Sequence, residues 1–118
     1  MKYRRFIPAL IWMMVIFYFS SLSTSGIGTD ETFRFTFFKS LHLIEYAILA
    51  ILIFIAIKKF SITILTSYIY AITDEIHQSF IFGRQGKFSD TLIDLTGIII
   101  GLLFVLIIRK KIPIKFTI

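Results

Sequence analysis

The sequence predicts an all-α protein, a bundle of four transmembrane helices with both termini in the cytoplasm. Two observations carry this prediction. Hydrophobic residues make up 57% of the chain and the mean hydropathy is +0.86, which is more apolar surface than a soluble domain of 118 residues can bury. The apolar residues also gather in runs long enough to cross a hydrocarbon core about 30 Å thick, with basic residues at the ends of the runs. We therefore expect one domain over residues 1–118 and a multi-pass location in the cell membrane.

The four expected spans cover approximately residues 6–22, 41–57, 62–82 and 91–108. The first follows the basic start MKYRR and has Pro8 near its beginning, where a missing backbone N–H costs least. A basic start, an apolar core and small residues also describe a signal peptide. The long aromatic-rich run and the three later spans favour a membrane helix instead.

The later spans differ in their polar content. Residues 23–38, with two glycines and an aromatic cluster, are predicted to form a loop that ends in an interfacial aromatic belt. The second span is closed by two lysines, and the third carries acidic residues and a histidine in its last turns. In the fourth, Asp94 is the one charged residue, and Gly97 and Gly101 form a GxxxG pair that lets another helix approach closely.

The distribution of basic residues predicts the orientation. Of the 13 Lys and Arg residues, nine fall on the side of both termini and four on the other side, so the positive-inside rule assigns the termini to the cytoplasm. The first group is Lys2, Arg4, Arg5, Lys58, Lys59, Arg109, Lys110, Lys111 and Lys115, and the second is Arg34, Lys39, Arg84 and Lys87.

Charge and cysteine content exclude several functions. The net charge of +6 comes from residues at the ends of spans, so nucleic-acid binding is not expected. The chain contains no cysteine, which excludes disulfides, thiolate metal ligands and a cysteine nucleophile.

The stretch Thr73–Asp94 concentrates polar groups between apolar sequences, where charged residues usually have a function. A second polar stripe follows helical spacing over Lys39, His42, Glu45 and Tyr46. The alternating topology brings both stretches to the non-cytoplasmic leaflet. We therefore expect an outward-facing polar pocket between the second, third and fourth spans, and a purely structural polar network is the alternative.

Two kinds of chemistry fit these residue types. Histidines and carboxylates can hold a divalent cation or act as general acids and bases. The zinc motif HExxH and the serine motif GxSxG are both absent, so the metal signal is weak and the serine signal weaker. Binding is the other reading, in which Arg84 and Lys87 beside a glycine loop grip an anionic headgroup.

Three segments resemble the VanZ-like family of small membrane proteins, named for a teicoplanin-resistance determinant. They are DEIHQSFIFGRQGKFSDTLIDLTGIIIG, KSLHLIEYAIL and the serine-terminated FYFSS of the first span, and the resemblance covers nearly the whole chain. The positions that match the family pattern are Asp74, Glu75, His77, Gln78, Gly83, Arg84, Asp90, Asp94 and Gly97. The resemblance implies a four-helix membrane protein linked to the response to glycopeptide or lipoglycopeptide antibiotics.

Two departures from the family pattern influence the choice of site residues. Phe82 stands where a proline is common, and the position of Asp94 is often asparagine, which implies that this carboxylate need not ionise or bind metal. The candidate catalytic residues are therefore Asp74, His77, Asp90 and His42. The candidate binding residues are Lys39, Glu45, Tyr46, Glu75, Gln78, Arg84 and Asp94, and the helix-packing residues are Gly97 and Gly101.

We thus expect envelope-level protection through binding of a lipid-linked or anionic envelope ligand. The expected partners are membrane lipid and a lipid-linked cell-wall precursor or a glycopeptide antibiotic. The alternative is a membrane-embedded enzyme that uses acid–base or metal-assisted hydrolysis or transfer on a lipid-linked substrate. The sequence leaves the cofactor, the metal and the oligomeric state open.

Overall fold

The computed structural model describes residues 2–21, 31–80 and 90–111, and almost all of them are helical. Within these ranges no residue forms a strand, so the all-α prediction is confirmed for the described part of the chain. The elements are a short 3₁₀ helix η1 (Lys2–Phe6) followed by α1 (Ile7–Ser20), α2 (Glu31–Ile57), α3 (Phe60–Gln78) and α4 (Asp90–Lys111).

Two of these helices are long and apolar enough to cross a membrane. The qualifying stretches are Lys39–Ile57 in α2 and Thr91–Lys110 in α4, close to the second and fourth predicted spans. By this criterion α1, with 14 residues, is too short, and α3 is too polar because hydroxyl and acidic side chains interrupt its apolar sequence. Helix length and composition alone therefore support two spans.

The loop predicted for residues 23–38 is wrong over its second half, because α2 already begins at Glu31. Neither glycine nor proline occurs between residues 29 and 57, so nothing interrupts the helix. An acidic residue in the first turn also suits the positive end of the helix dipole. The alternating phenylalanines had suggested a belt outside the helix, yet they lie on it.

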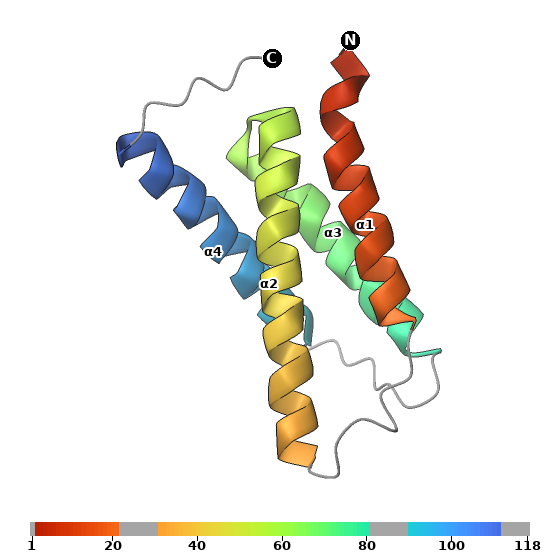
Figure 1. Cartoon of the computed structure of the whole chain (residues 1–118). Coiled ribbons are helices and arrows are strands. Elements are labelled where there is room, and N and C mark those ends of the chain that lie inside the picture. The colour runs from red at the N-terminus through yellow and green to blue at the C-terminus, as the bar shows by residue number, and fades with distance from the viewer. Residues whose placement is uncertain (1, 22–30, 81–89, 112–118) are drawn as a thin grey trace.

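The helices alternate in direction, and α2 and α4 run side by side in the same direction (Figure 1). Their register is visible at two glycines of α4. A Cβ atom on Gly97 would collide with the carbonyl oxygen of Leu43, and one on Gly101 with that of Ala47. A step of four residues along α4 thus corresponds to a step of four residues in the same direction along α2, as expected for parallel helices. The absence of a side chain at the two glycines lets the backbones touch.

Helix α2 forms the centre of the bundle. Its buried apolar residues pack against α3 and α4, while α1 lies across α2 and α3. Two hydrogen bonds to backbone carbonyls hold α1 in place: the Trp12 indole N–H donates to Glu45 (2.9 Å), and the Tyr70 hydroxyl donates to Met13 (2.5 Å). A left-handed residue, Lys58 (φ 65°), ends α2 and turns the chain into α3.

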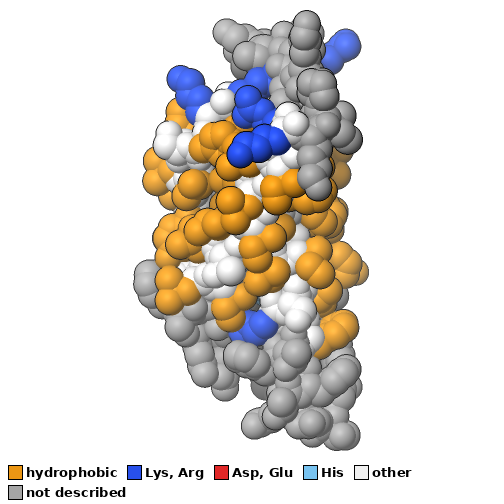
Figure 2. All heavy atoms as spheres, turned by 90° about the vertical axis from the view of Figure 1, so that its left-hand side faces the viewer, with side chains coloured by type: hydrophobic (Ala, Val, Ile, Leu, Met, Phe, Trp, Pro, Cys, Tyr) orange, Lys and Arg blue, Asp and Glu red, His pale blue; other side chains and the backbone are white. Residues whose placement is uncertain are grey.

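In the described part of the chain, many large apolar side chains are exposed and several charged or polar ones are buried, the opposite of the distribution in a soluble protein. Isoleucine, leucine and phenylalanine side chains are exposed along the helices, while several polar and acidic side chains, among them His42, Asp74, Glu75 and Asp94, are buried. Figure 2 shows the exterior of one face, where hydrophobic side chains form a belt between Lys and Arg side chains at the two ends. Such a surface is suited to the hydrocarbon core of a membrane, with its charged ends in the headgroups.

Because backbone contact at the glycines allows no Cβ, the substitution Gly101→Ala is expected to push α4 away from α2. Overpacking of this kind typically lowers the free energy of unfolding by about 1–3 kcal/mol. Thermal or SDS-induced unfolding of the purified protein in detergent measures the effect. Leu103→Ala, at a side chain that is 51% exposed on the same helix, is the control and should change stability little. Equal stability of the two variants would show that the backbones do not touch.

Candidate functional site

All four helices contribute polar side chains to one end of the bundle, where α1 and α3 end and α4 begins (Figure 1). Helical spacing explains the grouping. On α2, His42 and Tyr46 are four residues apart, and on α3 the same spacing separates Asp74 from Gln78, so each pair shares a face. The side chains that meet there are buried: Ser20, His42, Tyr46, Asp74, Glu75, Gln78 and Asp94.

Six of these side chains form a continuous chain of hydrogen bonds. Asp94 Oδ1 lies 3.2 Å from His42 Nδ1, and His42 Nε2 lies 3.1 Å from Gln78 Nε2. Gln78 Nε2 also donates to Ser20 Oγ (3.2 Å). The last two hydrogen bonds of the series are made by the Asp74 carboxylate. One of its oxygens accepts from Ser20 Oγ (2.5 Å) and the other from the Tyr46 hydroxyl (3.0 Å). The network thus links two carboxylates through an imidazole, an amide and a hydroxyl.

The direction of each bond follows from the donors available. Ser20 has one hydroxyl proton, and it goes to Asp74, so the serine oxygen accepts from the Gln78 amide. The same amide nitrogen faces His42 Nε2, which must therefore accept as well. The proton of a neutral His42 is then on Nδ1 and is donated to Asp94. In this arrangement Gln78 donates in both directions, towards a carboxylate at each end.

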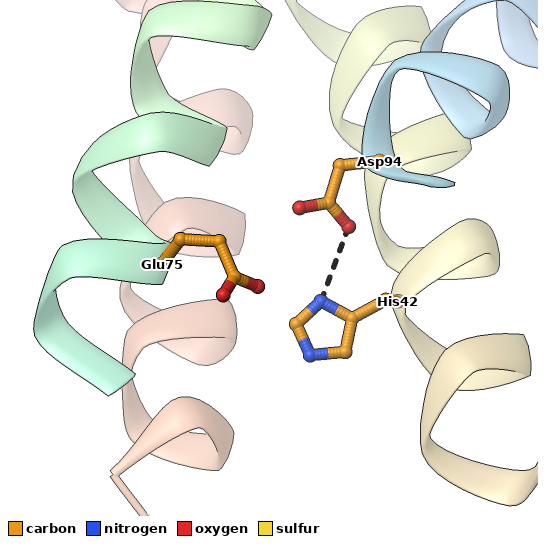
Figure 3. A group of neighbouring side chains, drawn as sticks. All are labelled: His42, Glu75 and Asp94. Carbon is orange, nitrogen blue, oxygen red and sulfur yellow. Dashed lines mark hydrogen bonds and ion pairs between the residues drawn. The ribbon is translucent and has the colours of Figure 1, made fainter. Parts of the chain in front are cut away.

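A compact trio lies at the Asp94 end of this network. His42, Glu75 and Asp94 come from three helices, and one ligand atom from each lies within 4.8 Å of the other two (Figure 3). Asp94 is fully buried, yet among the described residues its Oδ2 has no hydrogen-bond partner. The side chains have the donor types of a metal site or an acid–base pair.

The second histidine lies apart from this trio. His77 stacks on the Phe17 ring, with ring centroids 4.2 Å apart, and its Nε2 is 2.8 Å from Ser21 Oγ. The Ser21 hydroxyl also donates to the Phe17 carbonyl (2.8 Å), so its oxygen accepts from His77. The serine therefore orients the imidazole and is not activated by it.

The structure brings together most, but not all, of the residues that the sequence analysis selected. His42, Tyr46, Asp74, Gln78 and Asp94 are joined through hydrogen bonds, and Glu75 lies close to His42 and Asp94. His77 is separate, and Lys39 and Glu45 are half-buried. Arg84 lies outside the described residues, as does the side chain of Asp90, which opens α4. His42 contacts Asp94, a carboxylate that the catalytic candidates did not include, and reaches Asp74 only through Gln78 and Ser20.

The site also contains two residues that the candidate lists omit, Ser20 and Ser21. They close α1, and the alternation of helix directions puts the end of α1 beside the end of α3. Two adjacent hydroxyl residues at the end of an apolar run were the available signal. Their partners could not be inferred from the sequence, because the rotation of α1 about its axis is decided by packing.

The apolar exterior, the two membrane-length helices and the buried polar network define a small membrane protein with a polar interior at one end. The family described as VanZ/LLP1 matches residues 6–109. The chain therefore belongs to the VanZ-like family, a family of teicoplanin-resistance-type membrane proteins. No curated protein and no solved structure matches the chain significantly.

The network predicts a stability effect at Tyr46. The substitution Tyr46→Phe removes the donor to Asp74 Oδ2 and leaves a buried carboxylate oxygen without its partner. We expect the free energy of unfolding in detergent to fall by about 1–3 kcal/mol. Tyr18→Phe, at a ring that is 61% exposed, is the control and should have little effect. A loss no larger than that of the control would mean that this hydrogen bond contributes nothing to stability.

Proposed function

We propose that this protein is a multi-pass membrane protein with four spans that protects the cell envelope against teicoplanin-like lipoglycopeptides. It does so by binding a lipid-linked or anionic envelope ligand at the polar end of the bundle, which faces outward while both termini face the cytoplasm. The observation that carries the proposal is the buried hydrogen-bonded network from Asp94 to Tyr46, set at one end of a bundle with an apolar exterior. Family membership adds the link to teicoplanin.

The parallel course of α2 and α4 supports four crossings. Two neighbouring spans with the same direction require the chain to return across the membrane between them, and α3 is the segment that connects them. Its 19 residues extend over about 28 Å at 1.5 Å per residue, close to the thickness of the hydrocarbon core. Its acidic and amide side chains are turned inward: Asp74, Glu75 and Gln78 are buried, as are Thr63 and Ser67. The exposed isoleucine and leucine residues of α1 suit a fourth crossing.

We assign ligand contacts to three basic residues of the chain. Lys39 lies one helical turn before His42 on α2, and Arg84 and Lys87 belong to the segment that joins this end of α3 to α4. These cations can hold a phosphate or carboxylate group, and Arg84 can do so with two parallel hydrogen bonds. The network fixes the relative position of α2, α3 and α4, the helices that carry Lys39 or border the joining segment.

An enzyme is the second candidate, and one contact favours it. An imidazole oriented by a carboxylate, as His42 is by Asp94 at 3.2 Å, is a common general acid–base arrangement. This reading predicts a chemically altered antibiotic or lipid-linked precursor after incubation with the protein. The binding reading predicts that both are recovered unchanged, so mass spectrometry of the incubated compounds separates the two.

The four-span topology can be tested by cysteine labelling, since the chain has no cysteine of its own. We expect Ser79→Cys, just after α3, to react with a membrane-impermeant maleimide in intact cells. Arg4→Cys, Lys59→Cys and Lys110→Cys, all at exposed positions of the opposite end, should react only after permeabilisation. If α3 does not cross the membrane, Ser79→Cys and Lys59→Cys will label together, and if α1 does not, Arg4→Cys will label with Ser79→Cys.

The protective role predicts that expression in a susceptible Gram-positive host raises the minimum inhibitory concentration of teicoplanin. The substitution Asp74→Asn, which disturbs the shared acceptor of Ser20 and Tyr46, should return it to the value of cells that carry an empty vector. The matched control is Thr73→Val, since Thr73 is exposed and its hydroxyl bonds only the Tyr70 carbonyl of its own helix among the described contacts. Membrane levels of both variants are compared by immunoblot. Unchanged susceptibility in cells expressing the wild type would refute the protective role.

A further inference from the structure

Three helices bring one histidine and two carboxylates to a common point inside the bundle. His42 of α2, Glu75 of α3 and Asp94 of α4 are all buried, and one ligand atom of each lies within 4.8 Å of the others. Figure 3 shows the Glu75 and Asp94 carboxylates and the His42 ring turned towards the space between them. Of the catalytic candidates from the sequence this trio contains only His42, and its two carboxylates were assigned to binding.

A second observation concerns the carboxylate of Asp94. Asp94 is 0% exposed, and of its two oxygens only Oδ1 is hydrogen-bonded, to His42. Among the described residues the other oxygen, Oδ2, has no hydrogen-bond partner. A buried carboxylate oxygen without a partner is unfavourable, and in an apolar surrounding the cost is larger. A cation bound between the three side chains would remove it.

We propose that His42, Glu75 and Asp94 bind a divalent transition-metal ion of the Zn²⁺ type. One imidazole nitrogen and two carboxylate oxygens are a donor set that zinc accepts, whereas magnesium and calcium prefer oxygen alone. Three protein ligands leave a fourth position open for water or for a ligand. Two carboxylates and a divalent cation also sum to zero charge, which suits a site enclosed by apolar helices.

The geometry requires a modest contraction. Ligand atoms on a tetrahedral zinc ion with bonds of about 2.1 Å are roughly 3.4 Å apart, whereas the widest pair here is within 4.8 Å. Rotation of the two carboxylate side chains can reduce this difference. The backbones can stay in place, because the three residues come from helices that already pack against one another.

Gln78 supplies the outer contact that metal-bound histidines usually have. His42 Nδ1 faces Asp94, so it is the nitrogen available to the metal, while Nε2 is held by the Gln78 amide at 3.1 Å. With a metal ion on Nδ1, the single proton of the neutral ring would move from Nδ1 to Nε2, which must then find an acceptor. An amide presents a donor and an acceptor, so Gln78 can stay bonded to His42 in both states by turning its oxygen towards the ring.

The test is direct metal binding by the purified, tag-free, chelator-treated full chain in detergent. We expect about one Zn²⁺ per chain, as for a single three-ligand site, together with visible absorption bands when Co²⁺ replaces Zn²⁺. His42→Gln and Asp94→Asn should each weaken Zn²⁺ binding by about tenfold or more. The chain has only two histidines, so His77→Gln is a matched control and should retain the wild-type affinity.

Several outcomes overturn the proposal. They are the absence of saturable Zn²⁺ binding by the wild type, loss of binding in His77→Gln but not in His42→Gln, and equal binding of Mg²⁺ and Ca²⁺. If the two ligand variants do not fold, the wild type decides the matter, because Zn²⁺ must raise its thermal midpoint while Mg²⁺ at the same concentration does not. The measurement involves neither antibiotic nor envelope ligand, so its failure would leave the protective role standing.

Discussion

The site depends on the backbone contact between α2 and α4. Gly97 rests on the carbonyl of Leu43 and Gly101 on that of Ala47, so the two helices are fixed both in distance and in register. Asp94 lies one turn before Gly97, and His42 directly precedes Leu43. The same register therefore brings the Asp94 carboxylate to the His42 ring. Helices in lipid gain little from burying apolar side chains against one another, so close packing of small residues and polar contacts must supply much of their association.

The remaining helices complete the network that this contact begins. With α2 and α4 parallel, α3 returns between their opposite ends and brings Asp74, Glu75 and Gln78 to the level of His42. Ser20 of α1 then joins Gln78 to Asp74. Because Gln78 donates to His42 on one side and to Ser20 on the other, a single amide holds α3 to α1 and α2. Asp74 and Gln78, two of the polar groups that α3 carries into the interior, are thus bonded to neighbouring helices, as an apolar environment favours.

Sequence reasoning predicted that polar residues of several helices gather at one end of the bundle. It did not predict which of these side chains contact each other. Helical spacing grouped Lys39, His42, Glu45 and Tyr46 in one stripe, of which His42 and Tyr46 are buried in the structure and Lys39 and Glu45 are half-buried. It did not reveal that His42 contacts Asp94 while His77 turns to Ser21, because the rotation of one helix relative to another is a property of packing. The early start of α2 was missed for a local reason: alternating phenylalanines resemble an interfacial segment, yet helix propensity permits them.

A cation in the trio would also resolve a conflict within the proposed function. The carboxylates of Asp74, Glu75 and Asp94 would repel an anionic envelope ligand, since like charges in a medium of low dielectric repel strongly. With a divalent ion held by His42, Glu75 and Asp94, two of those three charges are neutralised and an open coordination position points to a negative group. Asp74 keeps two donors of its own, Ser20 and Tyr46. Lys39, half-buried on α2 one turn before His42, would then add its positive charge to that of the bound ion, so the metal proposal and the proposed anionic ligand are compatible.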